Sequence, residues 1–148
     1  MKIEGCERLL VDAERLWDLL SDPQQIVACV PGLVSYQISG SEISAKVKQG
    51  IGFLKGTFDA KVVIESNDRA GKTAVLKISG SSSLGTFDAS TSVFVRAQDE
   101  PSLCYSADVK VAGMLGTLSG AIIANSVKKM VQDFLKCAQE KLLQGNKL

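Results

Sequence analysis

Histidine is absent from this sequence of 148 residues. A Ser-His-Asp or Cys-His catalytic centre needs an imidazole as its general base, so both arrangements are excluded. Zinc sites of the HExxH type and other histidine-ligated metal centres are excluded for the same reason.

Closely spaced cysteine pairs are also missing. Cys6, Cys29, Cys104 and Cys137 form no CxxC motif, so a four-cysteine zinc site is formally open but disfavoured. Charges at positions 2, 4, 7 and 8 leave no room for the apolar region of a signal peptide. Without an export signal, we expect a cytoplasmic protein whose four cysteines are reduced thiols.

An excess of charge of one sign is lacking as well. The 17 basic residues nearly balance the 16 acidic residues, which gives a net charge of +1. Binding to nucleic acid normally needs basic residues clustered on one face, interleaved with aromatic residues where single strands are bound. No such cluster is present, so we expect no nucleic-acid partner.

The first third of the chain changes from a strand pattern to a helical pattern. Residues 1–10 begin with alternation and predict a strand. Helical spacing follows, with Asp12 as a plausible N-cap and Pro23 as the stop. Pro23 can also open a second short helix over residues 23–30. The segment ACVPG, which contains Cys29, then ends this helix and bends the chain.

From residue 33 to about residue 112 the pattern alternates with period two, and short turns predict six antiparallel strands. The last third predicts one amphipathic helix of about 25 residues that ends near Gly145. Its apolar face includes Leu115, Leu118, Ile122, Val127, Met130, Val131, Phe134, Leu135, Ala138 and Leu142. Lys129 and Asp133 fall on the remaining, solvent-facing arc.

This order of elements predicts an α+β fold of the helix-grip type, with a single domain over residues 1–148. A seven-stranded curved antiparallel sheet would wrap around the long C-terminal helix, with two short helices between strands 1 and 2. Many inward positions are small, which favours an apolar cavity between sheet and helix. The small inward residues are Ala45, Ala60, Ala74, Gly80, Ala89, Thr91 and Ala107. A tightly packed core is the alternative.

Three groups of residues are weighed as chemical sites. Cys29 lies near a helix C-terminus, where the dipole opposes a thiolate, so we interpret it as a buried packing residue. Asp59, Asp88 and Asp108 alternate with the inward residues and are predicted to face solvent rather than to form a paired-carboxylate site. Tyr105 faces inward, and the favoured interpretation is a core tyrosine whose hydroxyl has a hydrogen-bond partner; the alternative is that this hydroxyl orients the polar head of a ligand, for which it is the best single candidate.

An apolar loop and an uncharged stretch raise the question of membranes. Ile51, Phe53 and Leu54 fall at a predicted hairpin tip, where they would form a cavity lid or a docking surface. Residues 111–127 carry no charge, but they are diluted by polar residues and begin in a strand, so they do not predict a membrane span. Peripheral membrane contact through this end is a further hypothesis.

Four stretches carry a resemblance to a known family. They are MKIEG, LWDLLSDPQQIVACVPG, VKQGIGFLKGTFDAKV and GMLGTLSGAII. Together they resemble the carbon monoxide dehydrogenase G-subunit family, within the START/Bet v 1-like (SRPBCC) superfamily. The resemblance extends over nearly the whole chain. It implies a hydrophobic cavity with a quinone-type lipid as ligand, and a link to molybdenum hydroxylases of the carbon monoxide dehydrogenase type.

The resulting hypothesis is a non-enzymatic accessory protein that binds a lipid or quinone-like molecule and serves such a hydroxylase. It is expected to be cytoplasmic, with membrane association as a variant, and to have no cofactor, no metal and no catalytic residue. The alternatives are an assembly or docking protein without a ligand and, less favoured, an enzyme of the same superfamily. The predicted ligand-binding residues are Val30, Pro31, Phe53, Phe58, Phe87, Tyr105, Val109, Leu118 and Ile122.

Overall fold

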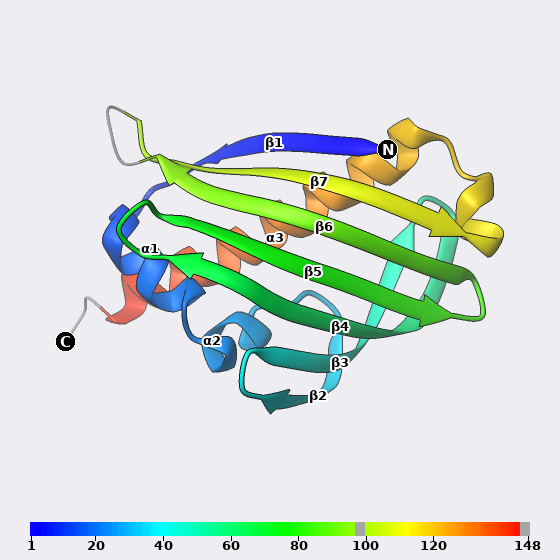
Figure 1. Cartoon of the computed structure of the whole chain (residues 1–148), viewed down its shortest axis with the longest axis horizontal. Coiled ribbons are helices and arrows are strands. Elements are labelled where there is room, and N and C mark those ends of the chain that lie inside the picture. Colours follow the sequence, from blue (N-terminus) through cyan, green and yellow to red (C-terminus); the bar gives the residue numbers. More distant parts are fainter. Residues whose placement is uncertain (97–99, 146–148) are drawn as a thin grey trace.

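A computed structural model describes residues 1–96 and 100–145 (Figure 1). One short strand comes first, then two short helices, six strands, a 3-10 turn and a long helix. Their bounds are β1 Lys2–Arg8, α1 Ala13–Leu20, α2 Pro23–Ala28, β2 Leu33–Ser39, β3 Glu42–Ile51, β4 Leu54–Asp68, β5 Thr73–Ser82, β6 Gly85–Arg96, β7 Ser102–Ala112, η1 Gly113–Thr117 and α3 Gly120–Gly145. The predicted order of strands and helices is confirmed.

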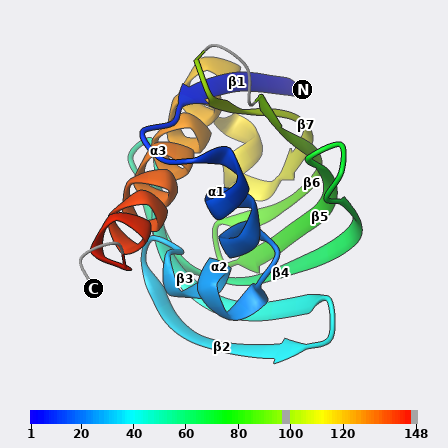
Figure 2. The same cartoon turned by 90° about the vertical axis from the view of Figure 1, so that its left-hand side faces the viewer.

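The seven strands form one antiparallel sheet in the order β1-β7-β6-β5-β4-β3-β2. Strands β2 to β7 pair as successive hairpins, and β1 closes the far side by pairing with β7. Figure 2 shows the sheet curving around α3, and Figure 1 shows α1 and α2 at one end of the sheet. The predicted helix-grip fold is therefore confirmed.

Local capping explains where the short helices begin. The Asp12 carboxylate accepts a hydrogen bond from the backbone N–H of Glu14 at 3.2 Å, as predicted for the start of α1. Asp22 caps α2 in the same way through the N–H of Gln24 at 3.0 Å, and Pro23 occupies the first turn. These side chains satisfy N–H groups that have no partner within the helix.

The long helix begins later than its apolar pattern predicts. Leu115 lies in η1, and Leu118 lies in the short link between η1 and α3. The hydroxyl of Ser119 then accepts a hydrogen bond from the N–H of Ile122 at 3.2 Å, at the start of α3. The prediction that Leu115 and Leu118 belong to the helix is wrong. Their spacing of three also fits a 3-10 turn that contains Leu115 and ends directly before Leu118.

Within the described part of the chain, buried side chains gather in three clusters between the sheet and the helices. The cap cluster lies beneath α1 and includes Trp17, which is 1% exposed. The central cluster lies between β1, β7 and α3 and contains Ile3, Tyr105, Ala107, Val109 and Ile123. The tip cluster lies beneath η1 and contains Leu54, Phe58 and Leu115.

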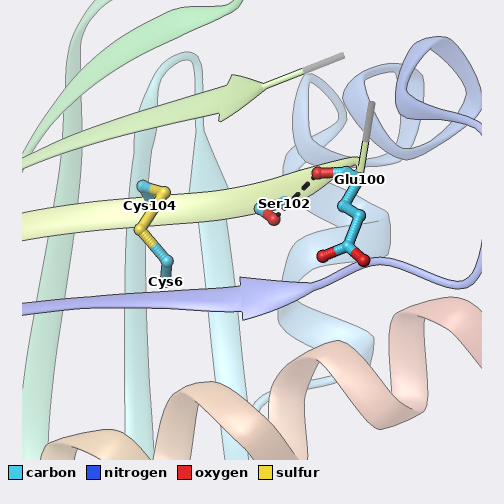
Figure 3. The surroundings of a disulfide bond; sticks show 4 residues. All are labelled: Cys6, Glu100, Ser102 and Cys104. Atoms are coloured by element: carbon cyan, nitrogen blue, oxygen red, sulfur yellow. Dashed lines mark hydrogen bonds between the residues drawn. A yellow bond between two sulfur atoms is a disulfide. The ribbon is translucent and has the colours of Figure 1, made fainter. Parts of the chain in front are cut away.

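The cysteines are paired, so the prediction of four reduced thiols is wrong. Cys6 on β1 faces Cys104 on β7 in the strand register, and the two form a disulfide (Figure 3). Cys29 at the end of α2 forms a second disulfide with Cys137 on α3. Residues about one hundred positions apart are brought together by the fold, which the spacing in the sequence could not reveal.

Candidate functional site

A pocket of about 620 Å³ lies along one flank of α3, where the helix faces the chain that leads into β2 and the end of β3. The bend after α2 and the β3–β4 turn form one wall, and α3 forms the other. Its lining residues are Pro31, Gln49, Gly50, Gly52, Ile122, Asn125, Ser126, Lys129, Met130 and Asp133.

The wall opposite α3 is fixed by backbone geometry that the sequence encodes. Gly32 has φ of +79°, and a Cβ at this position would lie 1.9 Å from the carbonyl oxygen of Lys48. The backbone N–H of Lys48 donates to the Gly32 carbonyl at 2.8 Å, and the Gln49 side-chain amide donates to the Pro31 carbonyl at 2.6 Å. The Pro31-Gly32 bend is therefore held against β3.

The α3 wall combines apolar and polar groups. Ile122 and Met130 contribute apolar surface, and Asn125 contributes an amide. Lys129 and Asp133 form an ion pair at 3.0 Å one helical turn apart. The pocket can therefore hold a molecule with an apolar body and a polar head.

The predicted ligand-binding residues divide into a rim set and an interior set. Pro31 and Ile122 line the pocket together, and Val30 is half-buried directly before Pro31. Phe53 lies beside the pocket residue Gly52 but is 77% exposed. The interior set is Phe58, Phe87, Tyr105, Val109 and Leu118, which belong to or pack against the tip and central clusters.

Tyr105 has an unusual environment. It is 5% exposed, and its hydroxyl is buried with no hydrogen-bond partner among the residues that the structure describes. The ring crosses over Gly5 on β1, where an added Cβ would lie 2.6 Å from the hydroxyl oxygen. Burial, and to a smaller extent the negative charge of Glu7, raise the pKa of Tyr105. Tyr105 remains a predicted head-group partner, placed in the central cluster rather than in the pocket wall.

The polar residues of the α3 wall are the ones that sequence reasoning missed. Lys129 and Asp133 are exposed, as their helical position predicts, but they also line the pocket. Asn125 and Ser126 line it too, whereas in the sequence their polar character counts only against a membrane span. The sequence does contain a signal for this wall of the pocket: these four residues follow Ile122, a predicted ligand-binding residue, at helical spacing and so share its face of α3.

Other candidate chemical sites find no support. Asp59, Asp88 and Asp108 are exposed, as predicted. Within residues 1–96 and 100–145, no group of three or more potential metal ligands occurs. Over the same residues, no helix is long and apolar enough to cross a membrane.

Comparison with solved structures defines the class of protein. A conserved protein from Geobacillus kaustophilus has a TM-score of 0.88 at 21% identity, covering 97% of this chain and 96% of its own. Ara h 8.0201 has a TM-score of 0.69 at 14% identity over 97% and 98% of the two chains. A START superfamily protein from Mycobacterium smegmatis also reaches 0.69 at 14% identity, over 97% of each chain. The fold is that of the Bet v 1/START-like helix-grip proteins.

Comparison of the sequence with family models identifies the family to which this chain belongs. The family model for CoxG, the G-subunit of carbon monoxide dehydrogenase, matches residues 5–143. This chain therefore belongs to the CoxG family, and the resemblance found in its motifs is confirmed. No curated protein matches the sequence.

Proposed function

We propose that this chain is a non-enzymatic accessory protein that holds a lipid or quinone-like molecule beside α3. The observation that carries this proposal is the pocket of about 620 Å³ between α3 and the Pro31–Gly52 side of the sheet. Its volume falls within the range of about 300–1,000 Å³ that is usual for small-molecule sites. The Bet v 1/START-like fold, which typically binds hydrophobic ligands, supports the same ligand class.

The lining favours an amphipathic ligand over a purely apolar one. The amide of Asn125 and the ammonium of Lys129 can donate hydrogen bonds to a carbonyl oxygen, while Ile122 and Met130 contact an apolar ring. A quinone or a lipid ester presents both features. The side chains of the interior set would then form the floor behind the ligand.

The lack of an acid–base pair supports a binding role. Asp133 is the acidic residue of the pocket lining, and it is already paired with Lys129. A general acid–base mechanism commonly uses two groups with separated roles near the substrate. Membership of the CoxG family supports the partner, a carbon monoxide dehydrogenase-type molybdenum hydroxylase.

The ligand can be tested on protein purified without detergent. Native mass spectrometry and solvent extraction are expected to find a co-purifying lipid or quinone. Titration with a short-chain ubiquinone analogue is expected to quench the fluorescence of Trp17. If neither a co-purifying molecule nor quenching is observed, the ligand proposal is refuted.

A matched pair of variants locates the site. Ser126→Trp fills the pocket wall, while Ala121→Trp enlarges another small α3 residue that does not line the pocket and is exposed. The first substitution is expected to weaken binding of the quinone analogue about tenfold or more, and the second to leave it unchanged, as measured by calorimetry. Equal effects of both would argue against this pocket.

A docking role without a ligand is the second candidate, because the three buried clusters fill much of the space beneath the sheet. Immobilised wild-type protein is expected to retain the molybdenum hydroxylase from the same cell. Retention by a protein that binds no quinone would favour docking alone, and loss of retention would refute the partner.

A further inference from the structure

The two outer strands of the sheet differ in charge. β2 forms the lower border in Figures 1 and 2, and among the described residues β3 is the only strand that pairs with it. The opposite border is β1, which has four charged residues among its seven, whereas β2, with the sequence LVSYQIS, has no charged residue and no proline. Outer strands usually carry such residues, because their unpaired backbone groups otherwise pair with another chain. β2 therefore lacks the protection that β1 has.

The register of β2 shows which of its backbone groups are unpaired. A two-residue turn joins β2 to β3, so the residues that flank it, Ser39 and Glu42, form a hydrogen-bonded pair. Such pairs alternate with non-hydrogen-bonded pairs along antiparallel strands. Gln37 therefore also bonds to β3, while the N–H and C=O groups of Tyr36 and Ile38 point away from it.

The regular part of β2 is symmetric about Gln37. A β-bulge between Leu33 and Ser35 disturbs the pairing with β3 at one end, and the turn after Ser39 ends the pairing at the other. Residues 35–39 lie between these limits, with Gln37 in the middle. An antiparallel pair of two such segments centred on this residue uses the whole regular part of the strand.

This pairing would satisfy the unpaired backbone groups of Tyr36 and Ile38. Tyr36 of each copy would lie opposite Ile38 of the other, and the two residues would exchange both hydrogen bonds. Their side chains share one face of the sheet, and an aromatic ring beside a β-branched side chain is a favourable cross-strand pair. The Gln24 side-chain amide donates to the Tyr36 hydroxyl at 3.0 Å, which holds this 42% exposed residue at the border.

We propose that two copies of this chain associate through β2, with Gln37 on the twofold axis, and so join their seven-stranded sheets into one. A strand of another protein fits less well, because the centred register and the uncharged sequence are complementary to themselves. The interface is small, so Kd is expected to be on the order of 10–100 μM. No residue of β2 lines the pocket, so the association does not depend on a bound ligand.

Self-association can be measured and located on the wild-type protein. Sedimentation between about 1 μM and about 1 mM is expected to show a monomer that becomes a dimer. Hydrogen exchange followed by NMR over the same range is expected to show rising protection at the amides of Tyr36 and Ile38. The amide of Gln37 bonds to β3 in the monomer already, so its protection is expected to stay constant.

A charge exchange tests the position of the twofold axis. Gln37 is exposed and would face its own copy, so Gln37→Lys and Gln37→Glu each oppose two like charges and are expected to weaken dimerisation about fivefold. An equimolar mixture of the two variants opposes unlike charges and is expected to restore the dimer. Ser90→Lys is the matched control, because Ser90 is exposed on the same outer face but lies in β6, within the sheet.

Three results would overturn the proposal. The first is a monomer at every concentration. The second is a dimer in which the exchange at Tyr36 and Ile38 does not change, which would place the interface elsewhere. The third is a Gln37→Lys protein that dimerises as strongly as Ser90→Lys, or a mixture of the two Gln37 variants that stays monomeric. Circular dichroism checks that every variant is folded.

Discussion

Reducing the two disulfides is predicted to remove most of the stability of this protein. The Cys6–Cys104 bond joins residues 98 positions apart, and the Cys29–Cys137 bond joins residues 108 positions apart. In the chain-entropy model, closing a loop of about 100 residues stabilises the folded state by about 4–5 kcal/mol. For a domain of this length, such a loss lowers Tm by roughly 10–15 °C.

The two bonds do not act independently. Once Cys6 and Cys104 are joined, the loop that Cys29 and Cys137 close becomes shorter, so its contribution falls to about 4 kcal/mol. The sum is comparable with the total stability of about 5–15 kcal/mol that is usual for a domain. The fully reduced protein is therefore expected to be marginally folded near room temperature.

Thermal unfolding of oxidised and reduced protein measures the effect. The double variants Cys6→Ser, Cys104→Ser and Cys29→Ser, Cys137→Ser each remove one bond. Comparing each variant with wild type, both fully reduced, measures the loss of packing alone, because neither protein then has a cross-link. This control matters because Cys104 is 1% exposed. Alkylation of the unreduced, denatured protein followed by mass spectrometry counts free thiols.

Two results would refute this reasoning. Four free thiols in the unreduced protein would show that neither bond forms. An unchanged Tm after complete reduction would show that the bonds form but do not constrain the unfolded chain.

Three further predictions rest on individual contacts. Gly80→Ala would place a Cβ 2.3 Å from the ring of Phe87, and chemical denaturation should show a loss of about 1–3 kcal/mol. Asp12→Ala removes the cap of α1 and should lower the free energy of unfolding by about 1 kcal/mol. Tyr105→Phe deletes an unpartnered buried hydroxyl and should be neutral or stabilising by about 1 kcal/mol in the same assay. Because burial raises the pKa of Tyr105, the folded protein holds the phenolic proton more tightly than the unfolded chain does. This group therefore leaves the free energy of unfolding unchanged at pH values below its ordinary pKa of about 10, and lowers it as the pH rises from there through the raised pKa. The Tyr105→Phe protein should lack this alkaline loss.

Local signals were sufficient to predict the architecture. The Asp12 cap, the Pro23 stop and the long alternating region each act over a few residues, and each is confirmed. Alternation also placed Asp59 and its counterparts in solvent, because neighbouring side chains in a strand point to opposite faces. Fold class follows from such patterns, since an apolar helix stripe and a half-apolar sheet must cover each other.

Contacts between distant segments could not be predicted in the same way. Four cysteines allow three pairings, and only the β1–β7 register places Cys6 opposite Cys104. The pocket likewise depends on where the Pro31-Gly32 bend meets α3, which is decided by the hydrogen bonds to Lys48 and Gln49. Such geometry is set by the completed fold rather than by any local pattern.

The position of the pocket on α3 favours an amphipathic ligand. Ile123 faces the core and is buried, whereas Ile122 and Ser126 lie about 100° and about 60° away from it around the helix, at the border with the polar arc. A ligand at this border meets apolar carbons on its inner side and the Asn125 amide on its outer side. A wholly apolar molecule would desolvate that amide without replacing its hydrogen bonds, at a loss of about 1–3 kcal/mol. A carbonyl-bearing ring avoids this loss, so the quinone analogue should bind more tightly than a hydrocarbon of equal size.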